Sequence, residues 1–384
     1  MKKNSTTKKS PKKANVGKAI PELKGKQRLT VGLDLGDKSS QYCILEEGGE
    51  IVSEGQVATT KVGLDSRFAK MPASRIALEV GTHSAWVSRH LAAMGHEVIV
   101  ANAHRVKLIT QSVRKNDRSD AQKLARLARV DPKLLSPIQH RGEQAQGDLG
   151  VIRARAELIK TRTELINSAR GLVKPMGERL KPCDADQVTA ALGESLSKGV
   201  QAVIMPLLRV VEGINKELGT YDKQIEELDK VYPEVKVLQQ VYGVGPLIST
   251  TFVLTLEDAG RFAHSRDVGP YLGLISKQRD SGESQPELGI TKAGDGLLRS
   301  LLVQGAHCIL RKGAPESDLR AWGLGKMESG GKRAKKRAIV AVARKLAVLL
   351  HHLWATGEVY DPQYNRKAAE AAAAKAKGKG KAAA

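Results

Sequence analysis

The order of apolar runs and turns between residues 28 and 101 limits the fold of this chain more than any other feature. Three runs rich in β-branched residues, LTVGLDL, QYCILEE and IVSEGQVAT, are separated by the turns GDKSS and GGE and predict an antiparallel meander. Two further strand patterns, RIALEVGT and HEVIVAN, then alternate with amphipathic helical patterns. This order predicts an α/β domain in which helices cover the faces of a mixed sheet.

Two acidic residues fall at the ends of predicted strands. Asp34 lies toward the C-terminal end of the first strand, and Glu79 lies near the end of the fourth. Ligands of such sheets tend to bind outside the carboxyl ends of the strands, so these side chains are candidates for a shared site. Each acid alone is weak support, because an acid at a strand end is often only a solvated cap.

Two more acids lie three residues apart in the basic segment RKNDRSDAQKLARL, residues 114–127. Asp117 and Asp120 share one face if this segment is helical. The cations around them are Lys115, Arg118 and Lys123, of which Lys115 and Arg118 are candidate nucleic-acid contacts. A D-x-x-D pair by itself is most often part of an exposed helix with mixed charges.

The order of all four acids changes this interpretation. Four carboxylates persist in one place only if divalent cations neutralise them. Paired magnesium ions held in this way can activate an attacking oxygen and stabilise a leaving oxygen in phosphoryl transfer. We therefore expect a magnesium site that acts on phosphates.

The charge of the chain indicates a polyanionic partner. Lys and Arg number 63 against 41 Asp and Glu, which gives a net charge of +22 and a pI near 9.8. Aromatic residues make up only 3%, so phosphate contacts are expected to supply more affinity than base stacking. Composition alone would also fit a nucleic-acid binder that carries out no chemistry.

Cysteine usage and hydropathy indicate a cytoplasmic protein with no membrane partner. The three cysteines form no C-x-x-C pair, so neither a zinc ribbon nor a disulfide framework is expected. The longest apolar stretch, residues 338–354, contains an Arg-Lys pair and predicts an amphipathic helix rather than a membrane span. Residues 1–27 and 363–384 are expected to be disordered tails, and the first lacks the apolar segment of a secretory signal.

Three of the segments described above, VGLDLGDKS, ALEVGTHS and KNDRSDAQKLARL, resemble the RuvC-like, RNase H-fold domain of the DEDD transposases. These are insertion-sequence enzymes related to the Piv invertase. The resemblance implies that residues 28–142 form this domain. It also implies an acidic tetrad that binds Mg²⁺, made up of Asp34, Glu79, Asp117 and Asp120.

Residues 143–236 have the spacing of paired helices. One apolar series recurs every seven residues and consists of Val151, Leu158, Leu165 and Leu172. A second series with alternating spacings of three and four runs from Val211 to Leu228. The two predict either an internal antiparallel hairpin or pairing between protomers. In the resembling family this region is an oligomerising coiled coil, which implies a dimer or tetramer.

Residues 237–362 predict a mainly α-helical domain. Its first part, LQQVYGVGPLISTTFVLTL, places a Gly-x-Gly turn between two apolar helical runs. This pattern is typical of a helix-hairpin-helix, in which Gly243 and Gly245 would let backbone amides approach a phosphate. A tight turn with no ligand explains the pattern equally well.

Ser281 lies in the polar loop RDSGESQPELG. Chemistry alone favours a turn residue, because no pattern supplies a base that would activate the hydroxyl. The order SG, a spacer, I-x-K-x-G and L-R nevertheless resembles the C-terminal module of the DEDD transposases. The resemblance implies that Ser281 is the nucleophile, with Ser284 as the nearest competitor. The companion motif contains Lys292, Gly294 and Arg299, of which Lys292 and Arg299 are candidate nucleic-acid contacts.

Two charged segments accompany this module, one acidic and one basic. The spacer ESQPEL is acidic where such modules usually carry Lys or Arg, which argues against direct phosphate contacts from the loop. The cluster KRAKKR, by contrast, favours a nucleic-acid face over a solvated helix start, because no acid opposes its cations. Its candidate contacts are Arg333, Lys335 and Lys336.

The resemblance covers residues 28–362 and implies a DNA transposase or recombinase of a bacterial insertion sequence, associated with the nucleoid. Ser281 would attack a DNA phosphate to form a covalent phosphoserine link, and a second DNA would reverse the step. The partners implied are donor DNA, target DNA and a bridge RNA that pairs with both.

Three other classes remain open on the residues alone. A RuvC-like junction-resolving endonuclease would use the acidic tetrad with water as the nucleophile. A nucleotide-dependent enzyme of the actin and sugar-kinase type also begins with a D-x-G turn, like Asp34 to Gly36, but no second phosphate loop is apparent. An architectural binder of DNA or RNA would need none of the acids.

Overall fold

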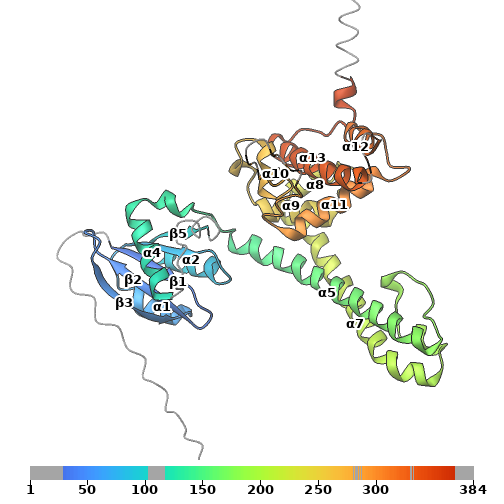
Figure 1. Cartoon of the computed structure of the whole chain (residues 1–384), viewed down its shortest axis with the longest axis horizontal. Coiled ribbons are helices and arrows are strands. Elements are labelled where there is room, and N and C mark those ends of the chain that lie inside the picture. The colour runs from blue at the N-terminus through green and yellow to red at the C-terminus, as the bar shows by residue number, and fades with distance from the viewer. Residues whose placement is uncertain are drawn as a thin grey trace, which may run out of the picture. The chain divides into compact units, whose positions relative to one another are not determined.

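The chain divides into two compact units, Met1–Glu143 and Gln144–Ala384 (Figure 1). The computed structural model describes residues 29–102, 117–279, 281, 284, 286, 288–328, 331 and 333–367. The predicted terminal tails and Lys115 lie outside these residues, apart from the first five positions of the C-terminal tail.

The N-terminal unit contains a five-stranded sheet in the order β3-β2-β1-β4-β5 (Figure 1). The strands are β1 (Thr30–Asp34), β2 (Ser39–Leu45), β3 (Ile51–Ala58), β4 (Arg75–Glu79) and β5 (Glu97–Ala101). The first three form the predicted antiparallel meander, and β4 and β5 run parallel to β1. This mixed sheet is consistent with an RNase H-like domain, as the sequence predicted.

The two faces of the sheet are covered by different helices. Leu33 and Leu78 belong to the core that packs against α1 (Lys61–Phe68) and α2 (Ser84–Ala93). Because side chains alternate along a strand, the residues that follow these leucines, Asp34 and Glu79, lie on the opposite face. Helix α4 (Asp117–Val130) covers that opposite face through Ala121 and Ala125 on one side and Leu124 and Ala128 on the other.

Gly32 allows α4 to lie very close to β1. A Cβ atom at Gly32 would be 1.9 Å from the Ala121 carbonyl oxygen and 2.5 Å from the Ala125 nitrogen. Both neighbours are backbone atoms, so no side-chain rotation could relieve the overlap. The glycine therefore sets the distance between the strand and the helix.

Hydrogen bonds at the C-terminal end of α4 fix its direction. Arg75, the first residue of β4, donates from Nη1 to the Ala128 carbonyl over 3.1 Å. Arg129 donates to the Glu47 carbonyl, in the turn between β2 and β3, over 3.2 Å. The last turn of α4 thus lies where β1 and β4 begin. Its first turn, with Asp117 and Asp120, lies toward the end where both strands finish.

The second unit begins with a long antiparallel hairpin of α5 (Glu143–Val173) and α7 (Lys198–Val231) (Figure 1). Arg155 donates to Asp222 over 2.6 Å, and Arg162 donates to Asn215 over 2.9 Å. Later residues of α5 therefore meet earlier residues of α7. One of the two predicted alternatives, the internal hairpin, is present in the chain.

The buried stripe of α5 lies one position later than the sequence predicted. Ile166 and Val173 are buried against α7, whereas Leu172 is 44% exposed and Leu165 is partly buried. Both stripes repeat every seven residues, so periodicity alone does not choose between them. The predicted stripe consequently lies along the edge of the hairpin.

The rest of the second unit is helical, as predicted, and packs around one core. Its helices are α8 (Glu234–Leu238), α9 (Pro246–Leu256), α10 (Val268–Tyr271), α11 (Gly296–Leu310), α12 (Asp318–Glu328) and α13 (Ala334–Thr356). The short elements of the chain are α6 (Ala191–Glu194), η1 (Pro132–Leu135), η2 (Lys174–Met176), η3 (Ala185–Gln187), η4 (Ala259–Arg261) and η5 (Ser265–Asp267).

Helix α13 contains the predicted apolar stretch. By length and composition it is the one helix in the described part of the chain that could cross a membrane. Half of its most apolar window is buried within the protein, and Val342, Leu346 and Leu350 belong to the core of the unit. This burial is the packing expected of an interior helix.

Replacing Gly32 with Ala is expected to destabilise the N-terminal unit by about 3 kcal/mol or more, because the new Cβ overlaps the backbone of α4. Urea unfolding, with hydrogen exchange of the β1 and α4 peptides, measures the loss. Gly48→Ala is the control, since its Cβ would meet only the end of the Glu46 side chain, at 3.5 Å. Equal stability losses in the two variants would contradict the packing role of Gly32.

Candidate functional site

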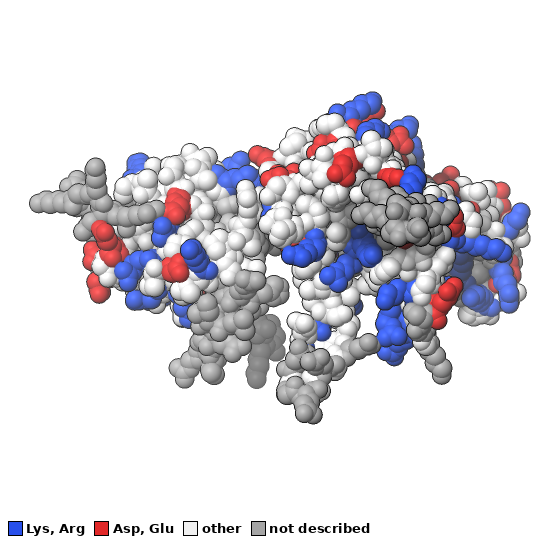
Figure 2. All heavy atoms as spheres, turned by 90° about the horizontal axis from the view of Figure 1, so that it is seen from above, with Lys and Arg blue, Asp and Glu red and all other residues white. Residues whose placement is uncertain are grey.

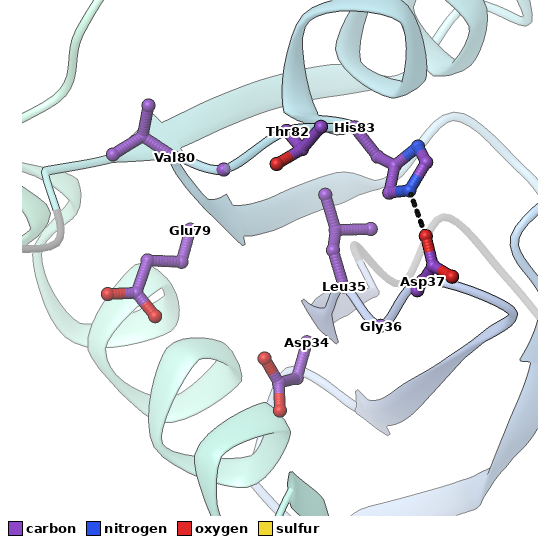
Figure 3. Close-up of a pocket in the computed structure, with 9 residues that line it drawn as sticks. Asp34, Leu35, Gly36, Asp37, Glu79, Val80, Thr82 and His83 are labelled. Atoms are coloured by element: carbon purple, nitrogen blue, oxygen red, sulfur yellow. Dashed lines mark hydrogen bonds and ion pairs between the residues drawn. The ribbon is translucent and has the colours of Figure 1, made fainter. Parts of the chain in front are cut away.

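A pocket of about 220 Å³ opens at the carboxyl ends of β1 and β4. Residues 34–37 line it from the β1 side, and residues 79–83 line it from the β4 side (Figure 3). Leu33 of β1 lies opposite Leu78 of β4 in the parallel ladder. Asp34 and Glu79 are the next residues of these strands, so the ladder brings the two acids together. Their carboxylates point to the same side of the pocket, toward α4 (Figure 3).

The other two acids of the predicted tetrad lie on the first turn of α4. Asp117 is exposed, and Asp120 accepts a hydrogen bond from Lys123 Nζ over 3.0 Å. Neither residue lines the pocket. Among the residues that the structure describes, no three His, Cys, Asp or Glu side chains lie close enough to hold a metal ion together.

Arg118, a predicted nucleic-acid contact, pairs with Glu54 on β3. Its Nε donates to Glu54 Oε2 over 2.9 Å, and Gln122, one turn later, binds the other carboxylate oxygen. The Glu54 side chain is only 12% exposed. Burial raises the pKa of Glu54, but the hydrogen bonds from Arg118 and Gln122 outweigh it and hold this pKa below its usual value. Glu54 therefore ties the start of α4 to the edge of the sheet.

Cys43 lies beneath the same helix and faces Glu54 across the β2-β3 ladder. Burial, together with the neighbouring Glu54 carboxylate, raises the pKa of the Cys43 thiol to about 12. The thiol therefore stays protonated near pH 7 and is not a candidate nucleophile.

Ser281, the predicted nucleophile, belongs to the second unit and is exposed. Its backbone exchanges hydrogen bonds with Ser284: the Ser281 N–H donates over 3.2 Å, and the Ser284 N–H donates back over 3.1 Å. The neck of this loop is closed where Lys277 N–H donates to the Gly289 carbonyl over 3.0 Å. The loop therefore presents Ser281 and its competitor Ser284 at the surface, between α10 and α11.

The companion motif holds the base of this loop. Arg299 Nη1 donates to the Leu272 carbonyl over 3.0 Å and to the Ala293 carbonyl over 2.8 Å. Gly294 has a φ of +68°, and a Cβ there would be 2.1 Å from the Tyr271 carbonyl oxygen. Lys292 is exposed. Arg299 therefore donates to backbone carbonyl oxygens and braces the base of the loop that carries Ser281.

The Gly-x-Gly turn joins α8 to α9. Gly243 has a φ of +85°, and a Cβ there would be 3.0 Å from the Gly305 carbonyl oxygen of α11. This packing alone accounts for a glycine at position 243. Gly245 precedes Pro246, the first residue of α9, and a Cβ there would meet no atom within 4 Å.

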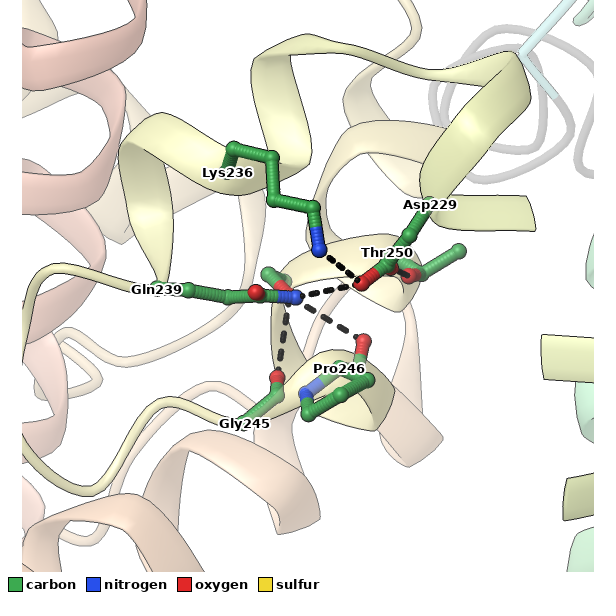
Figure 4. A network of polar contacts seen from close by, with 7 residues as sticks. Asp229, Lys236, Gln239, Gly245, Pro246 and Thr250 are labelled. Atoms are coloured by element: carbon green, nitrogen blue, oxygen red, sulfur yellow. Dashed lines mark hydrogen bonds and ion pairs between the residues drawn. The ribbon is translucent and has the colours of Figure 1, made fainter. Parts of the chain in front are cut away.

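A partly buried carboxylate fastens this turn to α7 (Figure 4). Asp229 accepts hydrogen bonds from Lys236 over 3.0 Å, from Gln239 over 2.9 Å and from Thr250 over 3.3 Å. Its side chain is 9% exposed. The turn between α8 and α9 is thus held in place by groups on three helices.

The basic cluster lies at the start of α13, where Arg333, Lys335 and Lys336 are exposed. On the face drawn in Figure 2, Lys and Arg side chains occur in several groups with Asp and Glu between them. Much of the net charge of the chain lies elsewhere in the sequence. Residues 1–28, 103–116 and 368–384 carry net charges of +9, +4 and +3, which together make up 16 of the +22.

Comparison with known proteins matches the chain in two parts. Residues 31–176 match the family model of the IS110-type DEDD transposases, described as Transposase. Residues 235–321 match the family model described as Transposase IS116/IS110/IS902 family. The chain belongs to the DEDD transposase family of insertion sequences. The members of this family are transposases, enzymes that cleave and rejoin DNA.

Curated relatives of this family member cover most of its length. The transposase for insertion sequence element IS1111A of Coxiella burnetii is 26% identical over 338 residues, which are 86% of this chain and 90% of that protein. A probable family 20 transposase of Pseudomonas aeruginosa is 26% identical over 86% of this chain and 98% of its own. The transposase for IS1328 of Yersinia enterocolitica is 24% identical, with the same coverage.

The sequence of this DEDD family member did not predict a role for three residues near the site. Asp37 and His83 line the pocket, and Glu54 anchors α4. Asp37 and His83 follow the two strand-end acids by three and four residues, a spacing that could have placed them near the pocket. No local signal marks Glu54, because its partners are 64 and 68 residues away along the chain.

Glu54→Gln is expected to lower the free energy of unfolding at pH 7 by about 2 kcal/mol, because the carboxylate that pairs with the charged Arg118 guanidinium becomes a neutral amide. The folded-state pKa of Glu54 lies below its usual value, so this stabilisation exists above the usual carboxyl pKa and is lost as the pH falls through the folded-state pKa. Chemical unfolding at several pH values measures both effects.

The control is Glu97→Gln, which also loses an ion pair on the sheet, with Arg75 over 3.1 Å, but at a side chain that is 43% exposed. This change is expected to cost about 0.5 kcal/mol or less. Native stability and an unchanged acid dependence in Glu54→Gln would show that Glu54 does not anchor α4.

Proposed function

We propose that this transposase cuts and rejoins DNA through a serine nucleophile, Ser281, with Mg²⁺ held by acidic residues of the N-terminal unit. The observation that carries the proposal is the pocket in which neighbouring parallel strands bring Asp34 and Glu79 together. The remaining proposed ligands are Asp117 and Asp120.

The donor groups of the pocket suit magnesium. Carboxylate oxygens are the protein ligands that Mg²⁺ prefers. Asp34 and Glu79 point to one side of the pocket, and α4 brings its acidic first turn toward the same ends of the strands. Magnesium, when bound, would neutralise these acids and polarise a DNA phosphate. Asp120 would then exchange its ion pair with Lys123 for the metal.

The chain's own groups account for the covalent step. The Ser281 oxygen would form a bond to phosphorus while the bond from phosphorus to one DNA oxygen breaks, and the serine proton would pass to that departing oxygen. Attack by a hydroxyl of a second DNA on the phosphoserine would reverse the step and consume no nucleotide. Ser281 suits this role because it is exposed on a loop whose base is braced by Arg299 and Gly294.

The proposed partners are donor DNA, target DNA and a bridge RNA. The positive charge of the terminal and central segments suits all three, since each phosphate contact releases a counterion and adds affinity. Candidate phosphate contacts in the second unit are the turn at Gly243 and Gly245, Lys292, and the exposed residues Arg333, Lys335 and Lys336. Lys115 is a further candidate next to the acids. The reaction would take place on DNA in the bacterial cytoplasm.

A homo-oligomer is proposed from the edge of the hairpin. Leu165 and Leu172 each precede a residue of the buried seam of α5, and Val203 and Val210 each precede one of α7. In an antiparallel helix pair, positions that precede the seam on both helices flank it on the same side. Val203 is 43% exposed and Val210 is 52% exposed, so this side offers an apolar stripe to a second copy.

Leu172→Glu is expected to weaken self-association at least about tenfold, because the new charge would be desolvated in the proposed interface. Sedimentation velocity over a range of concentrations measures the change. The control is Asn167→Glu, which adds the same charge at an exposed position that follows the seam residue Ile166 and so lies on the other side of the seam. Identical sedimentation of both variants and the native protein would exclude this stripe as the interface.

The test of the chemistry uses the full chain, Mg²⁺, RNA transcribed from the surrounding element and plasmid DNA that carries the element ends. A protein–DNA adduct that survives denaturation is expected, and mass spectrometry should place the link on Ser281. Ser281→Ala should abolish the adduct, and the matched variant Ser284→Ala should retain it. An adduct that persists in Ser281→Ala would refute the proposed nucleophile.

The pocket by itself also suits a second function, a RuvC-like junction-resolving endonuclease that uses water. That enzyme would need the acids of the first unit and no serine from the second. Asp34→Asn and Glu79→Gln should abolish cleavage under either mechanism. Undiminished strand cleavage by Ser281→Ala, with no adduct in any variant, would favour the endonuclease.

A further inference from the structure

The pocket has a second polar end, opposite the two acids. His83, just before α2, and Asp37, in the loop after β1, meet there, and Leu35 lies between them and the carboxylates of Asp34 and Glu79 (Figure 3). The His83 Nε2 atom lies 3.3 Å from Asp37 Oδ1. Neither residue is assigned a role by the proposed chemistry.

Trp86 fixes the hydrogen on the His83 ring. The indole nitrogen of Trp86 donates to His83 Nδ1 over 3.1 Å. An indole N–H can only donate, so Nδ1 must accept, and the neutral ring therefore carries its hydrogen on Nε2. The two rings also meet edge to face, with centroids 6.2 Å apart. His83 is thus an oriented donor whose N–H points at Asp37.

The partner of this donor is easily replaced. The Asp37 side chain is 88% exposed, and 3.3 Å is long for a hydrogen bond. Ion pairs and hydrogen bonds at such exposed positions contribute little to stability. An anionic oxygen that enters the pocket can therefore take over the His83 N–H at small cost.

We propose that His83 binds DNA in this pocket by donating from Nε2 to a non-bridging oxygen of a phosphodiester next to the reacting one. Asp37 occupies the donor until DNA enters. The inference rests on the proposed function, because it requires DNA to lie across the acidic pocket. With Nδ1 engaged by Trp86, His83 acts as a fixed hydrogen-bond donor and not as a proton carrier.

Two amide substitutions test which nitrogen of the His83 ring donates to DNA. In His83→Gln the amide N–H₂ reaches the position of Nε2, whereas in His83→Asn it reaches the position of Nδ1. The assay uses the full chain, element RNA and a fluorescent duplex from the element end, with Ca²⁺ in place of Mg²⁺ and with anisotropy as the readout. His83→Asn should weaken DNA binding roughly tenfold, as expected for loss of one charged hydrogen bond, and His83→Gln should stay within about threefold.

In the presence of Mg²⁺, which supports cleavage, the same variants show whether His83 affects DNA binding or the rate of the chemical step. His83→Asn should raise the DNA concentration for half-maximal rate and leave the rate at saturation within about twofold, because one phosphate contact is lost and the reacting groups remain. Glu79→Gln should instead abolish cleavage at every DNA concentration, because a proposed metal ligand is lost. A lower saturating rate in His83→Asn with unchanged DNA affinity would overturn the assignment.

Asp37→Ala gives a test that leaves His83 in place. Removing the competing acceptor should tighten DNA binding more than Asp65→Ala does. Asp65 is a matched control: it is exposed, lies in the same unit and also pairs with a histidine of α2, His90, over 2.9 Å. Equal effects of the two variants on DNA affinity would show that binding responds only to the loss of one negative charge, and would overturn the proposal.

The anisotropy measurements of DNA binding do not depend on strand cleavage. If Ser281→Ala and Glu79→Gln both left the reaction unchanged, the proposed function would fail, while the anisotropy series would still decide whether His83 contacts DNA. If the reaction behaved as proposed but His83→Asn bound DNA as the native protein does, only the assignment of His83 would fail. Melting temperatures of all variants establish that each is folded.

Discussion

The close contact between α4 and β1 at Gly32 governs the geometry of the N-terminal unit. Without a side chain at this position, the backbone of the helix lies directly on the strand, and two alanines complete the contact. Arg75 and Arg129 fix the direction of α4, and Glu54 holds its first turn to the edge strand. The acids on that turn are therefore carried toward the ends of β1 and β4.

The two units divide the proposed chemistry between them. In this proposal the first unit would supply the carboxylates for a metal, and the second would supply an exposed hydroxyl on a braced loop. The proposal requires both to reach one phosphate, within one chain or across two copies. Such a division would let binding of nucleic acid, and the proposed assembly through the α5-α7 hairpin, control when the reacting groups meet.

Several basic residues have structural roles that their sequence context did not indicate. Arg118 and Arg299 were predicted to contact nucleic acid, yet one binds the Glu54 carboxylate and the other binds two backbone carbonyls. An arginine has five donors, and nothing in its neighbours along the chain shows whether protein or phosphate oxygens accept from them. The stripe at Leu165 and Leu172 was similarly ambiguous, because the adjacent stripe repeats with the same period.

The sequence by itself determined the order of strands and helices in the first unit, the helical nature of the second and the family, because these depend on local periodicity and on motifs of neighbouring residues. Tertiary structure alone decided which acids share a pocket, which face of α5 is buried and which cations are engaged. These features arise from contacts between residues far apart in the chain, such as Glu54 with Arg118 and His83 with Asp37. Local patterns carry no record of such contacts.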